Sequence, residues 1–183
     1  MAARVPYVER GNMDAQGQEI YDRIRRDRNV PEVGLQFRAL LNNPKAAGHL
    51  TSMGAELRFQ SAIPENLKEL AIILVAREYN SSIEWTGHAV LAAKAGVTAK
   101  SIEAIRTGKP ITELTGDEQK IARFVHDLIR RKDVPDDVFA AVHALLGMRG
   151  VVDLTLTCSY YVALTLAQIA LKLEMDAGKV STL

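Results

Sequence analysis

The sequence contains very little cysteine and few aromatic residues. One cysteine, Cys158, occurs among 183 residues, and aromatic residues make up 5% of the chain. A single cysteine excludes an intramolecular disulfide framework and a Cys-x-x-Cys redox pair, and such cysteine usage is typical of a reducing compartment. We therefore expect a cytoplasmic protein, and a chain of this length is long enough to bury a hydrophobic core in one domain.

The sequence also lacks an excess of charge of either sign. It has 23 basic and 22 acidic residues, a net charge of +1, and no basic stripe. Because nothing in this balance favours nucleic acid or an anionic membrane, the expected partner is a small molecule or a protein. Residues 1–6 lack the apolar core of a signal peptide, and no run of about 18 apolar residues offers a membrane span. We expect a soluble protein with no membrane partner.

Alternating strand-like runs are missing, whereas apolar residues recur at intervals of three and four almost throughout. This pattern predicts an all-α protein with one helical domain over residues 13–183. Residues 1–12 show little periodicity, and we expect them to form an N-terminal arm. The predicted helices span 14–28, 33–42, 44–60, 64–79, 81–95, 98–107, 116–132, 135–146 and 150–176.

Turn and capping residues support several of these boundaries. Pro64 suits a first helical turn, Gly96 is placed to end one helix, and Thr98 is placed to cap the next. Thr115 precedes Glu118 by three residues, which is the spacing of a capping box.

One predicted helix is apolar on nearly every side from residue 67 to residue 76, so we expect protein to surround it. Glu69 lies within this segment. A charged carboxylate buried alone costs several kcal/mol (roughly) in desolvation, so Glu69 should have a polar partner. Two interpretations remain open: a catalytic group, or a structural ion pair with Arg77 or another arginine.

The next helix supplies candidate partners for Glu69. Glu84 and His88 are four residues apart and project from one face of a helix. A carboxylate can orient an imidazole that titrates near neutral pH, and this is the minimum equipment for moving protons without a cofactor. The alternative is a surface Glu–His pair of no functional importance. Trp85, the only tryptophan, is a candidate substrate contact or a packing residue.

These residues resemble the carboxymuconolactone decarboxylase family. The similarity is carried by Glu-Leu-Ala-Ile-Ile-Leu-Val-Ala-Arg-Glu at 69–78, Glu-Trp-x-x-His at 84–88, and Ala-Ala-Lys-Ala-Gly-Val at 92–97. It is clearest over residues 35–108 and weaker toward Tyr160-Tyr161. The resemblance implies the all-helical alkylhydroperoxidase D-like fold, and trimers or hexamers of helical subunits. The apolar residues of 151–173 separately favour a homo-oligomer, because they exceed what one small domain needs.

The resemblance implies that the peroxidase branch of this superfamily uses a glutamate, a Cys-x-x-Cys pair and a histidine. The corresponding positions here are Glu69, Ser81, Glu84 and His88, so both thiols are absent. Neither serine nor glutamate forms the sulfenic acid and disulfide that this mechanism requires, which leaves alkylhydroperoxidase-type antioxidant activity as a minor alternative.

The decarboxylase branch matches better, since it carries a glutamate, an aromatic residue and a histidine as at 84, 85 and 88. It implies a cofactor-independent lyase or isomerase acting on a small carboxylated lactone or related cyclic acid. We predict His88 as general acid/base, Glu84 as the group that orients or tunes it, and Glu69 as the remainder of the relay. Arg77, Ser81 and Trp85 are the predicted substrate-binding residues, with Arg38 and Arg58 as further cation candidates.

Two other possibilities follow from the same residues. A non-catalytic, ligand-binding oligomer of the same fold is the principal alternative to an enzyme. A metal site is not expected, because di-iron bundles use Glu and His three apart in paired copies, whereas this chain has one copy at a spacing of four. The remaining histidines, His49, His126 and His143, are interpreted as packing or surface residues.

Overall fold

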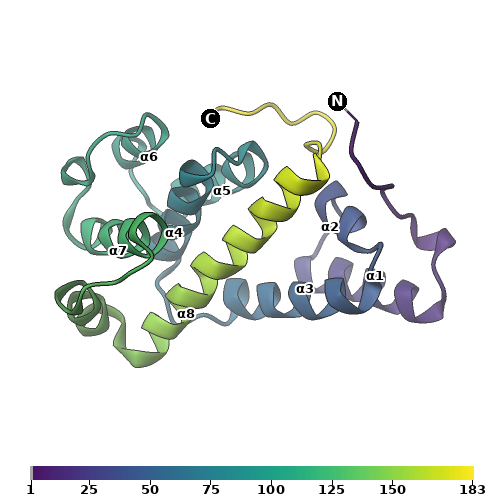
Figure 1. Ribbon diagram of the computed structural model, residues 1–183, viewed down its shortest axis with the longest axis horizontal. Helices are drawn as coiled ribbons and strands as arrows, with labels where there is room; N and C mark the ends of the chain where they lie inside the picture. Colours follow the sequence, from purple (N-terminus) through teal and green to yellow (C-terminus); the bar gives the residue numbers. More distant parts are fainter. Residues whose placement is uncertain (1) are drawn as a thin grey trace. The chain divides into compact units, whose positions relative to one another are not determined.

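The computed structural model describes residues 2–183, and over this range the chain is all-α, as predicted (Figure 1). The helices gather into two compact units. Unit 1 comprises the described part of Met1–Gln60 together with Leu166–Lys179, and unit 2 comprises Ser61–Thr165 with Val180–Leu183. The division of the chain into an arm at 1–12 and one domain at 13–183 stays a prediction.

Unit 1 is organised around the packing of α1 on α3, and α2 also packs on α3. Its core contains Tyr21 and Ile24 from α1, and Ala47 from α3, all nearly inaccessible to solvent. Its elements are η1 (Arg10–Asn12), α1 (Ala15–Arg28), α2 (Leu35–Leu40) and α3 (Pro44–Phe59).

The N-terminal residues contact other parts of unit 1. The amide of Arg4 donates to the carbonyl of Leu171 at 2.9 Å, and Arg38 on α2 bonds the Glu9 side chain. The N-terminus of α2 has no cap from Gly34, and the side chain of Asp176 accepts from the Leu35 amide at 2.9 Å instead. These bonds join segments far apart in sequence, which periodicity does not reveal.

Unit 2 is built around α4, which contacts α5, α6 and α7 (Figure 1). Every residue from Leu67 to Ala76 is buried, as the apolar composition of that segment predicts. Its elements before the last helix are α4 (Glu65–Glu78), α5 (Ser82–Lys94), α6 (Ala99–Arg106), η2 (Ile111–Glu113), α7 (Gly116–His126) and the π-helix η3 (Asp127–Arg131).

The predicted helix over 116–132 changes its hydrogen bonding part of the way along. α7 starts with the predicted capping box of Thr115 and Glu118 and ends at His126, after which η3 follows as a π-helix. Lys132 then takes a left-handed conformation at φ 60°, which stops the helix. Sequence periodicity does not separate an α-turn from a π-turn, because the two differ by one residue in the hydrogen-bonded ring.

The last helix, α8 (Asp136–Leu171), covers the two segments predicted as 135–146 and 150–176, and it is kinked between them, where the prediction placed the break. The only non-helical residue inside it is Gly147, at φ 68° and ψ 175°. The helix also ends five residues before the predicted end at 176, because Lys172 adopts a left-handed φ of 51°.

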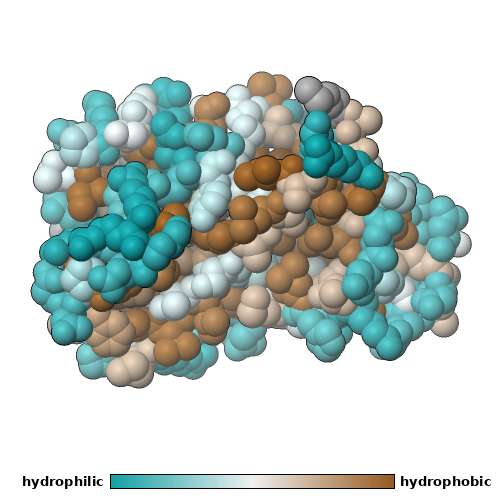
Figure 2. Space-filling view, viewed as in Figure 1, coloured by the Kyte–Doolittle hydropathy of each residue, from teal (hydrophilic) through white to brown (hydrophobic). Residues whose placement is uncertain are grey.

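By length and composition α8 is apolar enough to cross a membrane, with a mean hydropathy of 1.5 over its best window, of which 44% is buried. The sequence prediction excluded a span because charged and polar residues interrupt the run. A core helix of a soluble protein satisfies the same criterion, so this finding is weak support for a membrane location. Figure 2 shows brown and pale atoms along much of the line of α8, and further brown atoms in other parts of the same face.

Candidate functional site

Glu69 lies near the middle of α4 and is 1% exposed. Every residue of α4 from Leu67 to Ala76 is buried, so a side chain at any position in this segment lies inside the protein. The carboxylate accordingly has a buried partner: its Oε2 lies 2.7 Å from Nδ1 of His88. The expectation that Glu69 needs a polar partner is confirmed, and the partner is the histidine rather than an arginine.

His88 lies on α5 between two carboxylates. Its residue is 7% exposed, and its second ring nitrogen, Nε2, is 3.7 Å from Oε2 of Glu84 on the preceding turn. The structure therefore brings together all three predicted catalytic residues. The carboxylate closer to the imidazole is that of Glu69, on the neighbouring helix α4. The carboxylate of Glu84, four residues before His88 on the same helix, is farther away.

This geometry assigns different states to the two imidazole nitrogens. An ionised carboxylate only accepts hydrogen bonds, so the 2.7 Å contact places a proton on Nδ1 of His88, which donates it to Glu69. In the neutral ring Nε2 then carries the lone pair. At 3.7 Å its separation from Glu84 exceeds hydrogen-bond distance, and protonation of Nε2 would turn this contact into an ion pair.

The start of α5 fixes the position of Glu84. Ser81 is the N-cap, and its Oγ accepts a bond from the Glu84 amide at 3.3 Å. Ser81 is thus a helix cap, which was the alternative to its predicted role in substrate binding. Its capping bond sets where the first turn of α5 begins, and therefore where Glu84 lies relative to His88 one turn later.

Tyr161 is a site residue that sequence reasoning missed. It lies on α8, is 2% exposed, and contacts His88 edge-on, with ring centroids 4.9 Å apart and planes at 83°. Tyr160 in turn contacts Tyr161 at 5.2 Å. The Tyr160-Tyr161 pair marked the weaker end of the family resemblance, but its separation of more than 70 residues from His88 gave no indication of contact.

Trp85 belongs to the interior of unit 2. It is 1% exposed, and its Nε1 donates to Oγ1 of Thr182 at 3.1 Å. A ring whose indole N–H is already bonded and whose faces are covered is placed for packing, not for stacking on a ligand from solvent. The C-terminal segment at 180–183 provides this covering hydrogen bond.

The predicted cations bond to other groups. The Arg77 guanidinium donates to the carbonyl of Arg106 at 3.0 Å and to Oδ1 of Asn80 at 2.6 Å, so it ties α4 to the end of α6. Arg38 bonds Glu9, and Arg58 lies over the ring of Phe59. None of these contacts joins an arginine to His88, so none of them places a predicted anion-binding cation against the imidazole.

Cys158 is in no position to replace the missing thiols. It is fully buried on α8, and burial raises the pKa of its thiol to about 12. The thiolate is the reactive form, so this cysteine is inert at neutral pH. Across residues 2–183, no group of three or more histidine, cysteine, aspartate or glutamate side chains is arranged to hold a metal ion.

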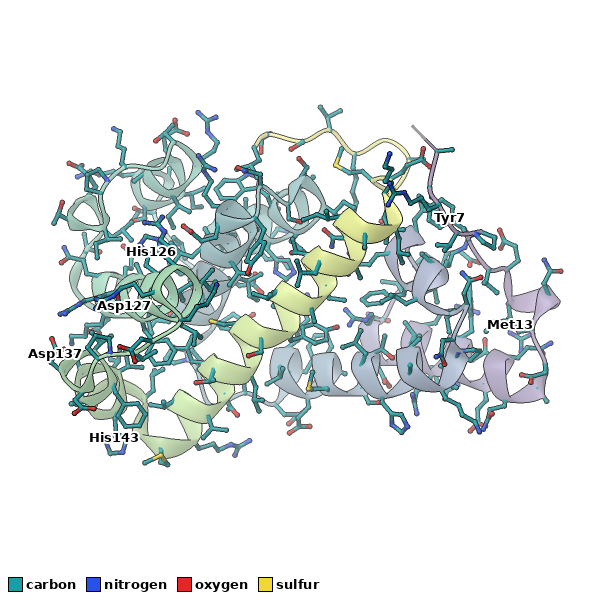
Figure 3. The ribbon with its side chains drawn as sticks, in the orientation of Figure 1. Tyr7, Met13, His126, Asp127, Asp137 and His143 are labelled. Carbon is teal, nitrogen blue, oxygen red and sulfur yellow. The ribbon has the colours of Figure 1, made fainter. Side chains whose placement is uncertain are left out.

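A second titratable cluster lies where α7 meets η3, at His126 and Asp127 (Figure 3). Arg130 donates to Glu78 at 2.7 Å through Nε, and Nε2 of His126 is 3.5 Å from the same carboxylate. Burial opposes ionisation of Glu78, but the bond and charge of Arg130 outweigh it and lower the pKa of Glu78. Burial, aided by the charge of Arg130, lowers the pKa of His126.

Hollows in the surface of unit 1 are lined by other residues. One of about 480 Å³ is bordered by Arg10, Asp22, Arg25 and Arg26, among others. A second, of about 350 Å³, has Arg23 and other residues of α1 and α3 at its rim. They give unit 1 polar concavities on its exterior.

Comparison with known proteins does not assign the chain to a family. No family model matches the sequence, and no curated protein matches it significantly. The resemblance to the carboxymuconolactone decarboxylase family therefore rests on the quoted motif residues alone.

Proposed function

We propose that this protein is a cofactor-independent lyase or isomerase of the carboxymuconolactone decarboxylase type, acting on a small carboxylated lactone or related cyclic acid. The observation that carries the proposal is the buried imidazole of His88, with Glu69 at 2.7 Å from one nitrogen and Glu84 at 3.7 Å from the other. Two buried carboxylates around one buried histidine form an arrangement suited to proton transfer.

The proposed roles follow from the two distances. Glu69 fixes the tautomer and orientation of His88, because it accepts the proton of Nδ1. Nε2 is then the nitrogen that takes up and delivers a proton, and Glu84 stabilises the imidazolium that forms. The sequence predicted that Glu84 orients or tunes His88 and that Glu69 completes the relay. In this proposal Glu69 takes the orienting role, and Glu84 keeps the tuning role.

In a decarboxylation the bond between the ring carbon and the carboxylate breaks, and its electron pair passes into the conjugated lactone. Nε2 of His88 first takes up a proton from solvent, which makes the ring an imidazolium between Glu69 and Glu84. Carbon dioxide leaves, the resulting carbanion equivalent takes that proton from Nε2, and His88 returns to its neutral form. Proton relocation without loss of carbon dioxide would use the same nitrogen first as base and then as acid. Positioned acid–base catalysis contributes on the order of 10²–10⁴-fold to a rate.

The test is a carbon dioxide release assay on small lactones, muconate-like diacids and pyrones, with wild type and His88→Gln. We expect turnover of at least one compound by wild type, and a loss on the order of 10²-fold or more in His88→Gln. His143→Gln is the matched control, because His143 is an exposed histidine on α8. Equal turnover by wild type and His88→Gln would contradict the proposal.

A second candidate function is a ligand-binding oligomer without catalysis. It is supported by the 7% exposure of His88 and by the carboxylate near each ring nitrogen, since a structural histidine is satisfied in this way. In this case the same compounds would stabilise wild type and His88→Gln equally in a thermal-shift assay, and none would turn over. The thiol peroxidase alternative has the least support, because the one thiol is buried and protonated.

A further inference from the structure

The larger hollow of unit 1, of about 480 Å³, is lined mainly by arginine side chains, and we call it the arginine hollow. Its volume falls within the range of about 300–1,000 Å³ that is usual for small-molecule sites. Three guanidinium groups face one carboxylate, so two positive charges of the lining are not compensated within it. The lining consists of Arg10, Asp22, Arg25, Arg26, Asn29 and Val30, all of which belong to unit 1.

Two elements that are close in sequence form the arginine hollow. The residues that α1 contributes recur at intervals of three and four, which places them on one side of this helix. The short helix η1 packs on α1, and Arg10 comes from η1. The guanidinium of Arg10 donates two bonds to the Asp22 carboxylate, at 2.8 Å from Nε and at 2.7 Å from Nη2. These two bonds hold Arg10 beside the arginines of α1.

Asp22 neutralises one of the three arginines. Both of its oxygens accept bonds from Arg10, whereas Nη1 of Arg25 lies 3.8 Å from Oδ1, which is beyond hydrogen-bond distance. The bond from Arg10, with the charges of Arg10, Arg25 and Arg26, holds the pKa of Asp22 below its ordinary value of 3.8, although desolvation opposes this shift. Arg25 and Arg26 therefore supply the positive charge that remains for a ligand.

Arg25 also has a donor that the protein does not use. Its Nε is buried and has no hydrogen-bond partner within residues 2–183. A buried donor without a partner is unfavourable, because it has lost its bond to water without gaining another. A rotation of this guanidinium that brings Nε to an anion in the hollow would provide the missing partner.

The charge and shape of the lining indicate the class of anion. Guanidinium groups are planar and bind phosphate and carboxylate oxygens through two parallel hydrogen bonds. A phosphate monoester carries a charge of about −1.5 to −2 at neutral pH, which matches the two uncompensated arginines. The hollow is larger than one phosphate group, and Asn29 and Val30 add an amide and an apolar side chain to its lining. These two residues suit the organic part of a phosphorylated molecule.

We propose that the arginine hollow binds the phosphate group of a small phosphorylated molecule. Arg25 and Arg26 bind the phosphate oxygens, and Asp22 positions Arg10 as the third cation. The proposal is independent of the proposed function, because the hollow belongs to unit 1 and the residues around His88 belong to unit 2. Failure of one proposal therefore leaves the other unaffected.

Calorimetric titration of the full chain with inorganic phosphate, ribose 5-phosphate and ribose, at constant ionic strength and neutral pH, tests the proposal. We expect inorganic phosphate to bind with a dissociation constant on the order of 1 mM, ribose 5-phosphate to bind more tightly, and ribose not to bind. Tighter binding of ribose 5-phosphate identifies a phosphate monoester as the ligand, as the size of the hollow predicts. Equal binding of the two phosphates identifies free phosphate.

Substitutions test which residues bind the phosphate. Arg25→Gln and Arg26→Gln should each raise the dissociation constant for ribose 5-phosphate at least about tenfold. Arg26→Lys should have a smaller effect, because it keeps the charge and loses the planar pair of donors. Circular dichroism establishes that the three variants remain folded, as expected for side chains that are exposed or partly exposed.

Arg28→Gln is the matched control. Arg28 lies on the same helix, and its guanidinium is 4.2 Å from the centroid of the Phe37 ring, outside the lining of the hollow. This change removes the same charge from the protein and should leave the dissociation constant within about twofold of the wild-type value. An equal effect of Arg26→Gln and Arg28→Gln would reduce the binding to an effect of net charge and overturn the proposal.

Two further results would overturn the proposal. One is the absence of a binding signal for both phosphate compounds up to about 10 mM. The other is tighter binding of malonate than of either phosphate compound, with the same loss in Arg26→Gln, which would make a dicarboxylate the ligand of this hollow.

Discussion

At the scale of single residues, the most consequential contact is the bond between Glu69 and His88. Glu69 is 1% exposed, and its carboxylate lies 2.7 Å from Nδ1 of His88. Removing one member of a buried pair is costly because the other is left without compensation, whereas removing both is much less so. The pair therefore couples stability to the proposed chemistry.

We predict that His88→Leu lowers the free energy of unfolding by about 3–5 kcal/mol, since it leaves the Glu69 carboxylate alone in an apolar interior. The double variant Glu69→Gln/His88→Leu should be more stable than His88→Leu, because it no longer buries a charge. Urea unfolding followed by circular dichroism measures both. If the single and double variants are equally destabilised, Glu69 is not charged in the folded protein.

At the scale of elements, the junction of α7 and η3 carries a pH-sensitive cluster. His126 has a folded pKa below its ordinary value of 6.5, and Glu78 has one below its ordinary value of 4.5. For a group whose folded pKa is depressed, the unfolded chain binds protons more readily. The stability it contributes is present above its unfolded pKa and is lost as the pH falls through its folded pKa.

We therefore predict that acidification lowers the urea midpoint in two stages, the first beginning below pH 6.5 and the second below pH 4.5. His126→Gln should remove the first stage and Glu78→Gln should weaken the second, in urea unfolding from pH 7 to pH 3. His143→Gln, which changes an exposed histidine, should retain both stages. A first stage that persists in His126→Gln would assign it to another group.

The break in α8 depends on one glycine. Gly147 has φ 68° and ψ 175°, a conformation that is essentially restricted to glycine. A Cβ placed there would contact nothing within 4 Å, so the penalty for a larger residue comes from backbone strain alone.

Gly147→Ala should accordingly destabilise the protein by about 1–3 kcal/mol. Gly87→Ala on α5 is the matched control, since its Cβ also meets nothing within 4 Å and its backbone is helical. That change should stabilise by about 0.5–1 kcal/mol. Thermal unfolding distinguishes the two, and a neutral Gly147→Ala would mean that α8 straightens without cost.

At the scale of the whole molecule, the described contacts of His88 all lie within unit 2. Glu69, Glu84 and Tyr161 belong to Ser61–Thr165, and Thr182, which bonds Trp85, belongs to Val180–Leu183. Unit 1 supplies none of these contacts. The candidate site should therefore depend on the folding of unit 2.

We predict that a fragment of residues 61–183 folds and unfolds cooperatively, with the buried Trp85 still emitting at short wavelength. Residues 166–179 should lose order, because Leu35, Gln36 and Arg4, which bond to this segment, are absent. Circular dichroism, tryptophan fluorescence and amide hydrogen exchange measure these outcomes. A fragment without a cooperative transition would show that the site requires both units.

The sequence by itself determined the helical class, most helix boundaries, and the three members of the buried cluster of Glu69, Glu84 and His88. It did so because apolar periodicity, capping residues and an isolated carboxylate in an apolar segment are local signals. Thr98 and the pair Thr115 and Glu118 cap helices as their spacing predicts.

Tertiary structure alone decided which carboxylate bonds His88, that Tyr161 contacts it, and that Arg77 and Trp85 are committed elsewhere. It also decided where α8 ends, and how the chain divides into two units. These depend on which segments, distant in sequence, meet in space. A helical spacing of four places Glu84 near His88, but only the packing of α4 on α5 brings Glu69 to 2.7 Å.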